Sequence, residues 1–168
     1  MSSTAARPTT TGTLRTAAHH VLDQVTAVLA AHSVTALRVS LGLVFLAFAS
    51  AKFVAGASPA EDLAVATVTE LTFGLVSGPD ALLLTALTET VIGLTLLTGR
   101  FVRLGLLVLA GAMVGIMSPL VLFPEQMWSD GGPTLAGQYV FKDIVLVAGA
   151  LVVTAHALGA RLRTDDDR

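Results

Sequence analysis

Four long apolar stretches dominate the pattern of hydrophobic and polar positions along the chain. They run from about Leu37 to Ala57, Ala81 to Gly99, Phe101 to Phe123 and Gly137 to Leu158. A helix needs about 20 mostly apolar residues to cross the hydrocarbon layer of a membrane, and each stretch meets that length. The pattern therefore predicts an all-α fold, a bundle of four transmembrane helices within a membrane domain at residues 36–159.

Breakers and caps separate these spans from one another. Gly78, Pro79 and Asp80 form a strong breaker before the second span, and Gly99 suits the C-cap at its end. Pro119 is expected to kink the third span. The connector before the second span has a mixed character and predicts a short amphipathic helix on the outer surface, at about residues 63–76.

The N-terminal part has a different pattern. Residues 1–13 are small and polar and are expected to form a disordered cytoplasmic tail. At residues 14–34 a helix is predicted that suits the membrane surface, since its apolar side chains share one face: Val21, Val25, Val28 and Leu29. A simple extension of the first spanning helix is an equal alternative. Residues 160–168 are expected to form a second, charged cytoplasmic tail.

The arginines predict how the chain is inserted. With a cytoplasmic N-terminus, four spans return the C-terminus to the cytoplasm, and every arginine then lies on the cytoplasmic side. The two outer loops carry acidic residues and no basic ones. We therefore expect a multi-pass protein of the cell (inner) membrane with both termini cytoplasmic. The Ala55-Gly56-Ala57 sequence resembles a signal-peptide cleavage site, but the apolar stretch before it is too long for a signal peptide.

Composition supports a membrane protein and excludes several kinds of chemistry. Of the 168 residues 54% are hydrophobic and 13% are charged, whereas a soluble domain carries about 25% charged residues. The net charge of −2 gives no sign of nucleic-acid binding. The sequence has no cysteine, which excludes a disulfide, a thiol nucleophile and a thiolate metal site. Three of the four histidines lie before the first span, so no metal site is predicted.

Four ionisable residues lie within the spans: Lys52, Glu89, Lys142 and Asp143. Glu89 is at the middle of the second span, where a charge costs roughly 2.5–3.5 kcal/mol and therefore needs a partner or a cavity. Helical side chains lean toward the N-terminus of their helix, so Lys52 leans toward the midplane and Glu89 leans outward. The two side chains are therefore expected to approach each other.

Two interpretations of these charges remain open. In the first, Glu89 is the floor of a polar pocket that binds a small polar molecule or a quinone head group, or relays protons. Thr85, one turn before Glu89, is a further candidate for this pocket, together with Lys142 and Asp143. In the second interpretation, the ion pair of Lys52 and Glu89 only fixes the packing of the helices.

Other residues have expected structural roles. Arg38 is interpreted as a cytoplasmic anchor of the first span. Gly111 and Gly115 form a GxxxG pair, which is expected to pack closely against another helix. Asp143 is a candidate acceptor for a hydrogen bond from Tyr139, one turn earlier. The threonines of the second span are expected to bond back to their own helix.

Three segments of the sequence resemble a known family. The first span, RVSLGLVFLAFASAKF, resembles the opening signature of the DoxX-like small integral membrane proteins, and LTETVIGLTLLTGR resembles their second helix. The segment GGPTLAGQYVFKDIVLVAGAL is similar to a related family of unknown function that includes reactive-chlorine-resistance inner-membrane proteins. The resemblance covers residues 36–155. It places the polar positions of the family at Arg38, Lys52, Glu89, Lys142 and Asp143.

The resemblance implies a four-helix membrane bundle and suggests a function. Some DoxX-type proteins are subunits of thiosulfate:quinone oxidoreductase or of membrane complexes that cope with oxidative stress. The expected function is an accessory membrane subunit of a quinone-linked redox or oxidative-stress-resistance system, with quinone as the candidate ligand. A small oligomeric transporter or channel component and a quinone-linked oxidoreductase are the alternatives. The expected partners are the lipid bilayer and a redox protein or further copies of the chain.

Overall fold

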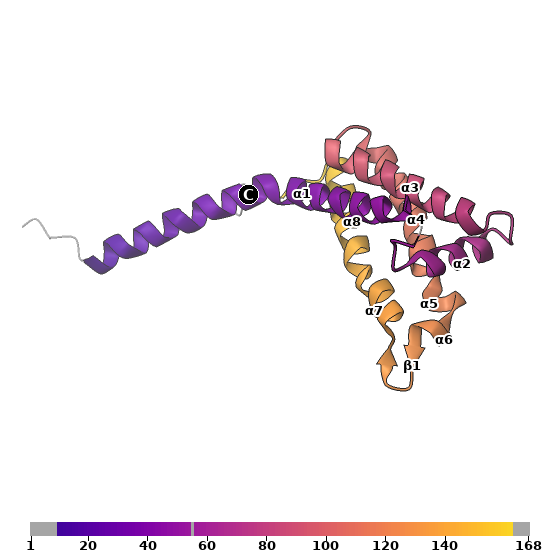
Figure 1. Cartoon of the computed structure of the whole chain (residues 1–168). Coiled ribbons are helices and arrows are strands. Elements are labelled where there is room, and N and C mark those ends of the chain that lie inside the picture. The colour runs from indigo at the N-terminus through magenta and orange to yellow at the C-terminus, as the bar shows by residue number, and fades with distance from the viewer. Residues whose placement is uncertain (1–9, 55, 163–168) are drawn as a thin grey trace, which may run out of the picture. The chain divides into compact units, whose positions relative to one another are not determined.

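Helices make up most of the chain that the structure describes. In the computed structural model this is residues 10–54 and 56–162. A short antiparallel hairpin pairs β1 (Trp128–Ser129) with β2 (Gly132–Pro133). The helices are α1 (Thr10–Lys52), α2 (Glu61–Leu71), α3 (Gly78–Thr98), α4 (Val102–Met117), α5 (Pro119–Leu122), α6 (Pro124–Met127), α7 (Leu135–Lys142) and α8 (Ile144–Ala157) (Figure 1).

Four helical stretches in the described residues are long and apolar enough to cross a membrane. They are His19–Lys52, Gly78–Thr98, Val102–Leu122 and Leu135–Ala157. The third joins α4 to α5, and the fourth joins α7 to α8. The prediction of an all-α fold with four spanning helices is confirmed. The first helix ends at Lys52 rather than at Ala57, which places Lys52 at a helix end.

The N-terminal segment is not a separate surface helix. Residues 10–52 form one uninterrupted helix of 43 residues, so the alternative of an extended first helix is what the structure has. Residues 10–13 of the expected disordered tail belong to this helix. Residues 1–9 and 163–168 of the two expected tails lie outside the described residues. The chain divides into two units within α1, after Val34, and the second unit is Thr35–Ala160.

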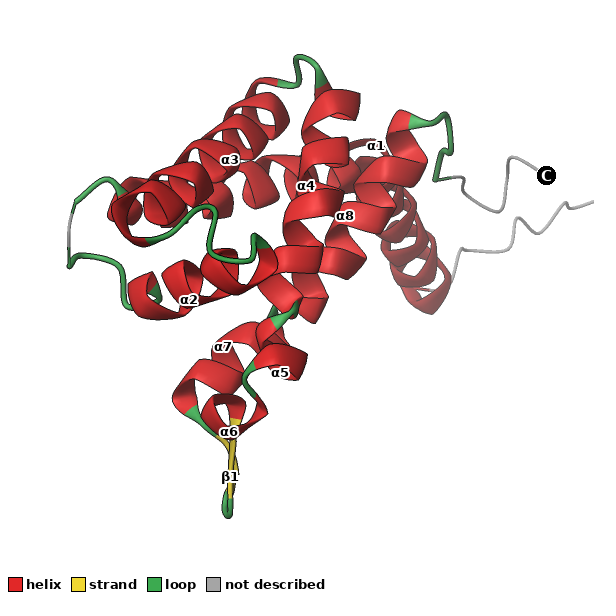
Figure 2. Ribbon diagram, turned by 90° about the vertical axis from the view of Figure 1, so that its right-hand side faces the viewer, coloured by secondary structure: helices red, strands yellow, loops and turns green. Residues whose placement is uncertain are grey.

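Within the unit Thr35–Ala160, α3 is in contact with both α2 and α4, and α4 in turn packs against α8 (Figure 2). The buried side chains recur every three or four residues, which places them on one face of each helix. On α1 the buried face comprises Leu41, Phe45, Ala49 and Lys52. On α3 it comprises Ala81, Leu82, Ala86, Glu89, Ile92, Gly93 and Leu96. The buried faces of α1 and α3 thus carry one charged residue each, Lys52 and Glu89.

The backbones of α1 and α3 approach each other closely at two glycines. A Cβ atom added at Gly42 would lie 2.7 Å from the backbone nitrogen of Leu97 and 3.0 Å from the carbonyl oxygen of Gly93. A Cβ atom added at Gly93 would lie 3.0 Å from the carbonyl oxygen of Gly42 and would also overlap Leu46. The two backbones therefore touch, which only residues without a side chain permit.

The predicted packing of the GxxxG pair is wrong within this chain. A Cβ atom at Gly111 would meet nothing within 4 Å, and one at Gly115 would meet only the Leu71 side chain, at 3.9 Å. The reason is the phase of α4: its buried positions are Gly105, Leu106, Leu109 and Met113, so Gly111 lies on the exposed side. On this helix Gly105 is the close-packed glycine, because a Cβ there would overlap the Thr95 side chain.

The loop before the fourth span is tightly folded. The Thr134 hydroxyl caps α7 by accepting a hydrogen bond from the Gly137 N–H at 3.0 Å, and it donates one to the Gln126 carbonyl at 2.6 Å. Gly137 packs directly on the carbonyl of Met127, where a Cβ atom would not fit. These contacts fix the start of α7, which carries Tyr139 and Lys142.

Candidate functional site

A buried ion pair joins α1 to α3. The Lys52 ammonium donates to Glu89 Oε1 at 2.9 Å and to Oε2 at 2.8 Å. The two side chains are only 5% and 8% exposed, so the pair is shielded from solvent. The expected approach of Lys52 to Glu89 is confirmed. Because Lys52 is the last residue of α1, the pair ties the end of this helix to the middle of α3.

The hydrogen-bonding capacity of Lys52 is used up within the protein. Its third acceptor is the backbone carbonyl of Phe48, one turn earlier on α1, at 3.5 Å. An ammonium has three donors, and the two Glu89 oxygens and this carbonyl account for all of them. The Phe48 ring adds a cation–π contact, with its centroid 5.7 Å from Lys52 Nζ. The pair is therefore closed, which means that Lys52 has no donor left for a ligand.

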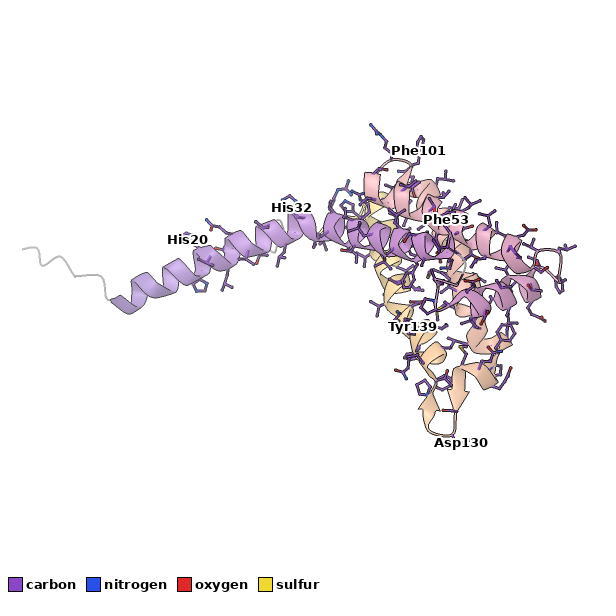
Figure 3. All side chains as sticks on the ribbon, in the orientation of Figure 1. His20, His32, Phe53, Phe101, Asp130 and Tyr139 are labelled. Atoms are coloured by element: carbon purple, nitrogen blue, oxygen red, sulfur yellow. The ribbon has the colours of Figure 1, made fainter. Side chains whose placement is uncertain are left out.

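A second lysine shares the same aromatic ring. Lys142 Nζ lies 5.6 Å from the centroid of the Phe48 ring and 4.0 Å from that of the Tyr139 ring. Figure 3 labels Tyr139 on α7. Lys142 follows it by one turn and lies over its ring, so the lysine leans toward the N-terminus of its helix as expected. Phe48 and Tyr139 are 41% and 49% exposed. Lys142 thus lies on an accessible aromatic surface beside the closed pair.

The fourth spanning helix is interrupted at its charged residues. Asp143 separates α7 from α8 with ψ of −9°, and its N–H bonds to the Val140 carbonyl three residues earlier, at 3.1 Å. This is the tighter geometry of a 3₁₀ turn, which often marks a functional position within a helix. The Asp143 carboxylate is close enough to interact electrostatically with both Glu89 and Lys142. Lys52, Glu89, Lys142 and Asp143 therefore form one cluster.

Two expected contacts of this cluster differ in the structure. The Thr85 hydroxyl donates to its own helix, to the Ala81 carbonyl at 2.9 Å, and so does not bond to Glu89. The other threonines of α3 also bond to the carbonyl four residues earlier, as expected for hydroxyls in a span. Tyr139 presents its ring to Lys142, and its hydroxyl makes no described bond to Asp143.

Arg38 has a role that the sequence did not reveal. Its guanidinium donates to the Leu96 carbonyl and, at 3.4 Å, to the Leu97 carbonyl. These carbonyls lie in the last turn of α3, where they have no partner within the helix. Gly99 ends the helix in the left-handed conformation, at φ of 73°, and its N–H satisfies the Thr95 carbonyl. Arg38 on α1 therefore caps α3 and joins the two helices at the end opposite the ion pair.

Phe48 is the site residue that sequence reasoning missed. A phenylalanine in an apolar span gives no signal of its own. Its position one turn before Lys52 was the available clue, because side chains four residues apart are neighbours on a helix. Its contact with Lys142 is between helices that are far apart in sequence, and no spacing rule predicts it.

The described residues thus define a class of protein, a helical membrane protein with an ion pair closed within its bundle. Residues 33–123 match the DoxX family, and this is more than half of the chain. The protein therefore belongs to the DoxX family. The matched range includes Arg38, Lys52 and Glu89 and ends before Lys142 and Asp143. No curated protein and no solved structure matches the chain.

Proposed function

We propose that this DoxX-family protein is an accessory membrane subunit of a quinone-linked redox or oxidative-stress-resistance system. In this proposal Lys142 and Asp143 receive the head group of a quinone or of a similarly small polar molecule. One observation carries the proposal. Neither side chain has a hydrogen bond or an ion pair with any described residue, whereas the neighbouring Lys52 and Glu89 satisfy each other.

The chemistry of the two free groups suits a quinone. A quinone carbonyl accepts the hydrogen bond that the Lys142 ammonium can donate, and a quinol hydroxyl donates the bond that the Asp143 carboxylate can accept. The exposed rings of Phe48 and Tyr139 offer an apolar surface for the ring of the guest. Lys142 is itself exposed, so a ligand dissolved in the bilayer reaches it from the side.

The accessory character rests on the composition of the chain. With no cysteine in its sequence, the protein leaves thiol redox chemistry to a partner. Its contribution in this proposal is to hold the head group and to keep the ring oriented while the partner exchanges electrons with it. Glu89 does not contact the guest but neutralises Lys52, so that the charge next to the guest is set by Lys142 and Asp143.

Photolabelling with a reactive quinone analogue tests this proposal. We expect Lys142→Met and Asp143→Asn each to lower labelling of the purified protein by about tenfold, because a hydrogen bond to a charged group is worth roughly 1.5–3 kcal/mol. Asp80→Asn is the matched control, since Asp80 is an exposed carboxylate on α3 and is not part of the cluster. Labelling that is the same in all variants would reject the site, and thermal stability excludes unfolding as the cause of a loss.

A specific observation supports a second candidate function, a transporter component. Discontinuous membrane helices commonly form the substrate sites of secondary transporters, and the fourth span is interrupted at Asp143. Solute flux into proteoliposomes that contain only this protein, lost in Asp143→Asn, would favour this candidate. Quinone labelling without flux would favour the redox function.

The proposed place in the cell (inner) membrane has both termini in the cytoplasm, because the positive-inside rule puts all arginines there. A reporter that is active only outside the cytoplasm is expected to give no signal when fused after Arg168. The same reporter inserted between Ser129 and Gly132, in the hairpin before α7, is expected to be active. The reverse pattern would invert the topology and would move Lys142 and Asp143 to the cytoplasmic half.

A further inference from the structure

Two phenylalanines are held in an unusual backbone conformation near the two ends of α3. Phe73 has φ of 52° and Phe101 has φ of 56°, and within the described residues these two are the non-glycine residues with positive φ. This left-handed region is disfavoured for bulky residues, because the Cβ atom comes too close to the following carbonyl oxygen. Phe73 lies in the turn before α3, and Phe101 lies in the turn after it (Figure 3).

The rings of both phenylalanines face out of the protein. Phe73 is 96% exposed and Phe101 is 78% exposed. Glycine adopts positive φ without a steric cost, and the same two turns use it at Gly74 and Gly99, with φ of 80° and 73°. A phenylalanine in such a turn therefore adds strain that packing within the described protein does not offset. Strained residues that persist are typical of functional positions, which directs attention to what these rings contact outside the protein.

The turn that carries Phe73 is fixed by hydrogen bonds. The Thr72 hydroxyl donates to the Val68 carbonyl at 2.7 Å and accepts from the Val76 N–H at 3.1 Å. One side chain thus ties the end of α2 to the far side of the turn, so the fold sets the direction in which the Phe73 ring projects. Leu75 on the same turn is 88% exposed and enlarges the apolar surface.

The turn that carries Phe101 is fixed by the start of α4. Phe101 is the N-cap residue of this helix, and its carbonyl accepts a hydrogen bond from the Gly105 N–H at 3.0 Å. The preceding residue, Arg100, is exposed. A guanidinium forms strong hydrogen bonds with phosphate oxygens. This turn therefore exposes an aromatic ring next to a group that suits the phosphate of a lipid.

The length of α3 places both turns at the boundaries of the membrane. A helix of 21 residues is about 32 Å long, close to the 30 Å or so of the hydrocarbon layer. The helix has almost no length to spare, so each of its ends lies at one boundary whichever end faces the cytoplasm. Phenylalanine and leucine side chains at this depth enter the region between the head groups and the acyl chains.

We propose that Phe73 and Phe101 bind lipid at opposite boundaries of the membrane and thereby fix the depth of α3. Each ring inserts among the upper carbons of the acyl chains, and Arg100 binds a lipid phosphate beside Phe101. Glu89 lies near the middle of α3, so the same two contacts keep the pair of Lys52 and Glu89 away from both boundaries. This inference uses residues outside the proposed ligand site and does not depend on that site.

The single tryptophan of the sequence allows a clean fluorescence test. In a Trp128→Phe background, Phe73→Trp and Phe101→Trp are compared with Asp130→Trp, a control at the tip of the hairpin (Figure 3). All three sites are exposed, so a tryptophan fits at each. The full chain is placed in phosphatidylcholine vesicles whose acyl chains are brominated near the head group, because bromine quenches an indole ring that it touches. We expect Phe73→Trp and Phe101→Trp to lose most of their emission relative to unbrominated vesicles, and Asp130→Trp to retain it.

Iodide in the aqueous phase gives the opposite readout. It is expected to quench Asp130→Trp strongly and the other two variants weakly. Iodide quenching of Phe73→Trp or Phe101→Trp as strong as that of the control would overturn the proposal. Shielding from both quenchers would overturn it too, because the ring would then be covered by protein, such as a second copy of the chain. Bromine quenching at one site alone would overturn the fixing of depth, which needs both boundaries.

Discussion

Replacing Glu89 by leucine is expected to lower the free energy of unfolding of the bundle by about 3–5 kcal/mol, the cost of leaving one member of a buried pair without its partner. The change removes both Glu89 oxygens that accept from Lys52 and leaves it only the Phe48 carbonyl, although the Lys52 side chain is just 5% exposed. Lys52→Met is expected to have a similar effect, because the Glu89 carboxylate then loses both of its hydrogen bonds. Thermal unfolding in one detergent measures both losses.

The double variant tests whether the bundle needs the ion pair itself or is destabilised only when one charge is left without its partner. Lys52→Met together with Glu89→Leu replaces the whole pair by apolar groups, and such replacements are often neutral or stabilising in protein interiors. We therefore expect the double variant to regain most of the lost stability. Glu70→Gln, an exposed carboxylate on α2, is the control and should not change the unfolding temperature. Wild-type stability in Glu89→Leu would show that the pair does not hold α1 to α3.

The sequence predicted the elements of this fold well because the membrane imposes a simple rule. Each spanning helix must satisfy its own backbone, so length and apolar composition were enough to find all four. The approach of Lys52 to Glu89 was also predictable, because helical side chains lean in a known direction. These inferences use only the depth of a residue in the membrane and the direction of its helix. They do not require knowledge of which helices are neighbours.

The sequence failed where the rotation of a helix about its axis decides the outcome. Gly111 and Gly115 fit a packing motif, yet the motif does not state which way α4 faces. Neither Gly42 nor Gly93 has another glycine three or four residues away on its own helix, and therefore neither gave a signal. Their partners are each other, across α1 and α3. The same limit explains why the contact between Phe48 and Lys142 was missed. It depends on how α1 and α7, which are distant in sequence, are arranged in space.

The sequence predicted which residues form the site better than it predicted the contacts between them. Rare charges within spans pointed to Lys52, Glu89, Lys142 and Asp143, because each is costly in lipid. The sequence left open which of these residues pair with one another, and the structure shows the pairing. Glu89 forms an ion pair with Lys52, whereas Lys142 makes cation–π contacts with the rings of Phe48 and Tyr139. This difference moves the candidate ligand position from Glu89, the expected floor of a pocket, to the interruption of the fourth span.

The crossing of α1 and α3 yields the second large effect. Gly42→Ala places a methyl group 2.7 Å from a backbone nitrogen and 3.0 Å from a backbone oxygen, and neither can move without shifting a helix. Overpacking of a tight contact typically costs about 1–3 kcal/mol, and backbone neighbours put this case at the upper end of the range. The expected result is a lower unfolding temperature for Gly42→Ala. Gly93→Ala is expected to behave in the same way, with part of the strain absorbed by the flexible Leu46 side chain.

Gly111→Ala is the matched control, since it makes the same chemical change in a spanning helix where a Cβ atom meets nothing within 4 Å. Alanine is a better helix former than glycine by about 1 kcal/mol in soluble helices, so this variant should be as stable as the wild type or more so. We therefore expect Gly42→Ala to lower the unfolding temperature and Gly111→Ala to raise it or leave it unchanged. If Gly111→Ala destabilised the protein more than Gly42→Ala, the exposed face of α4 would be the tight contact, and it would have to be made by another molecule. The separation of α1 from α3 would then also be set by something other than the Gly42–Gly93 crossing, and the ion pair at the end of α1 would lose the support that this crossing gives it.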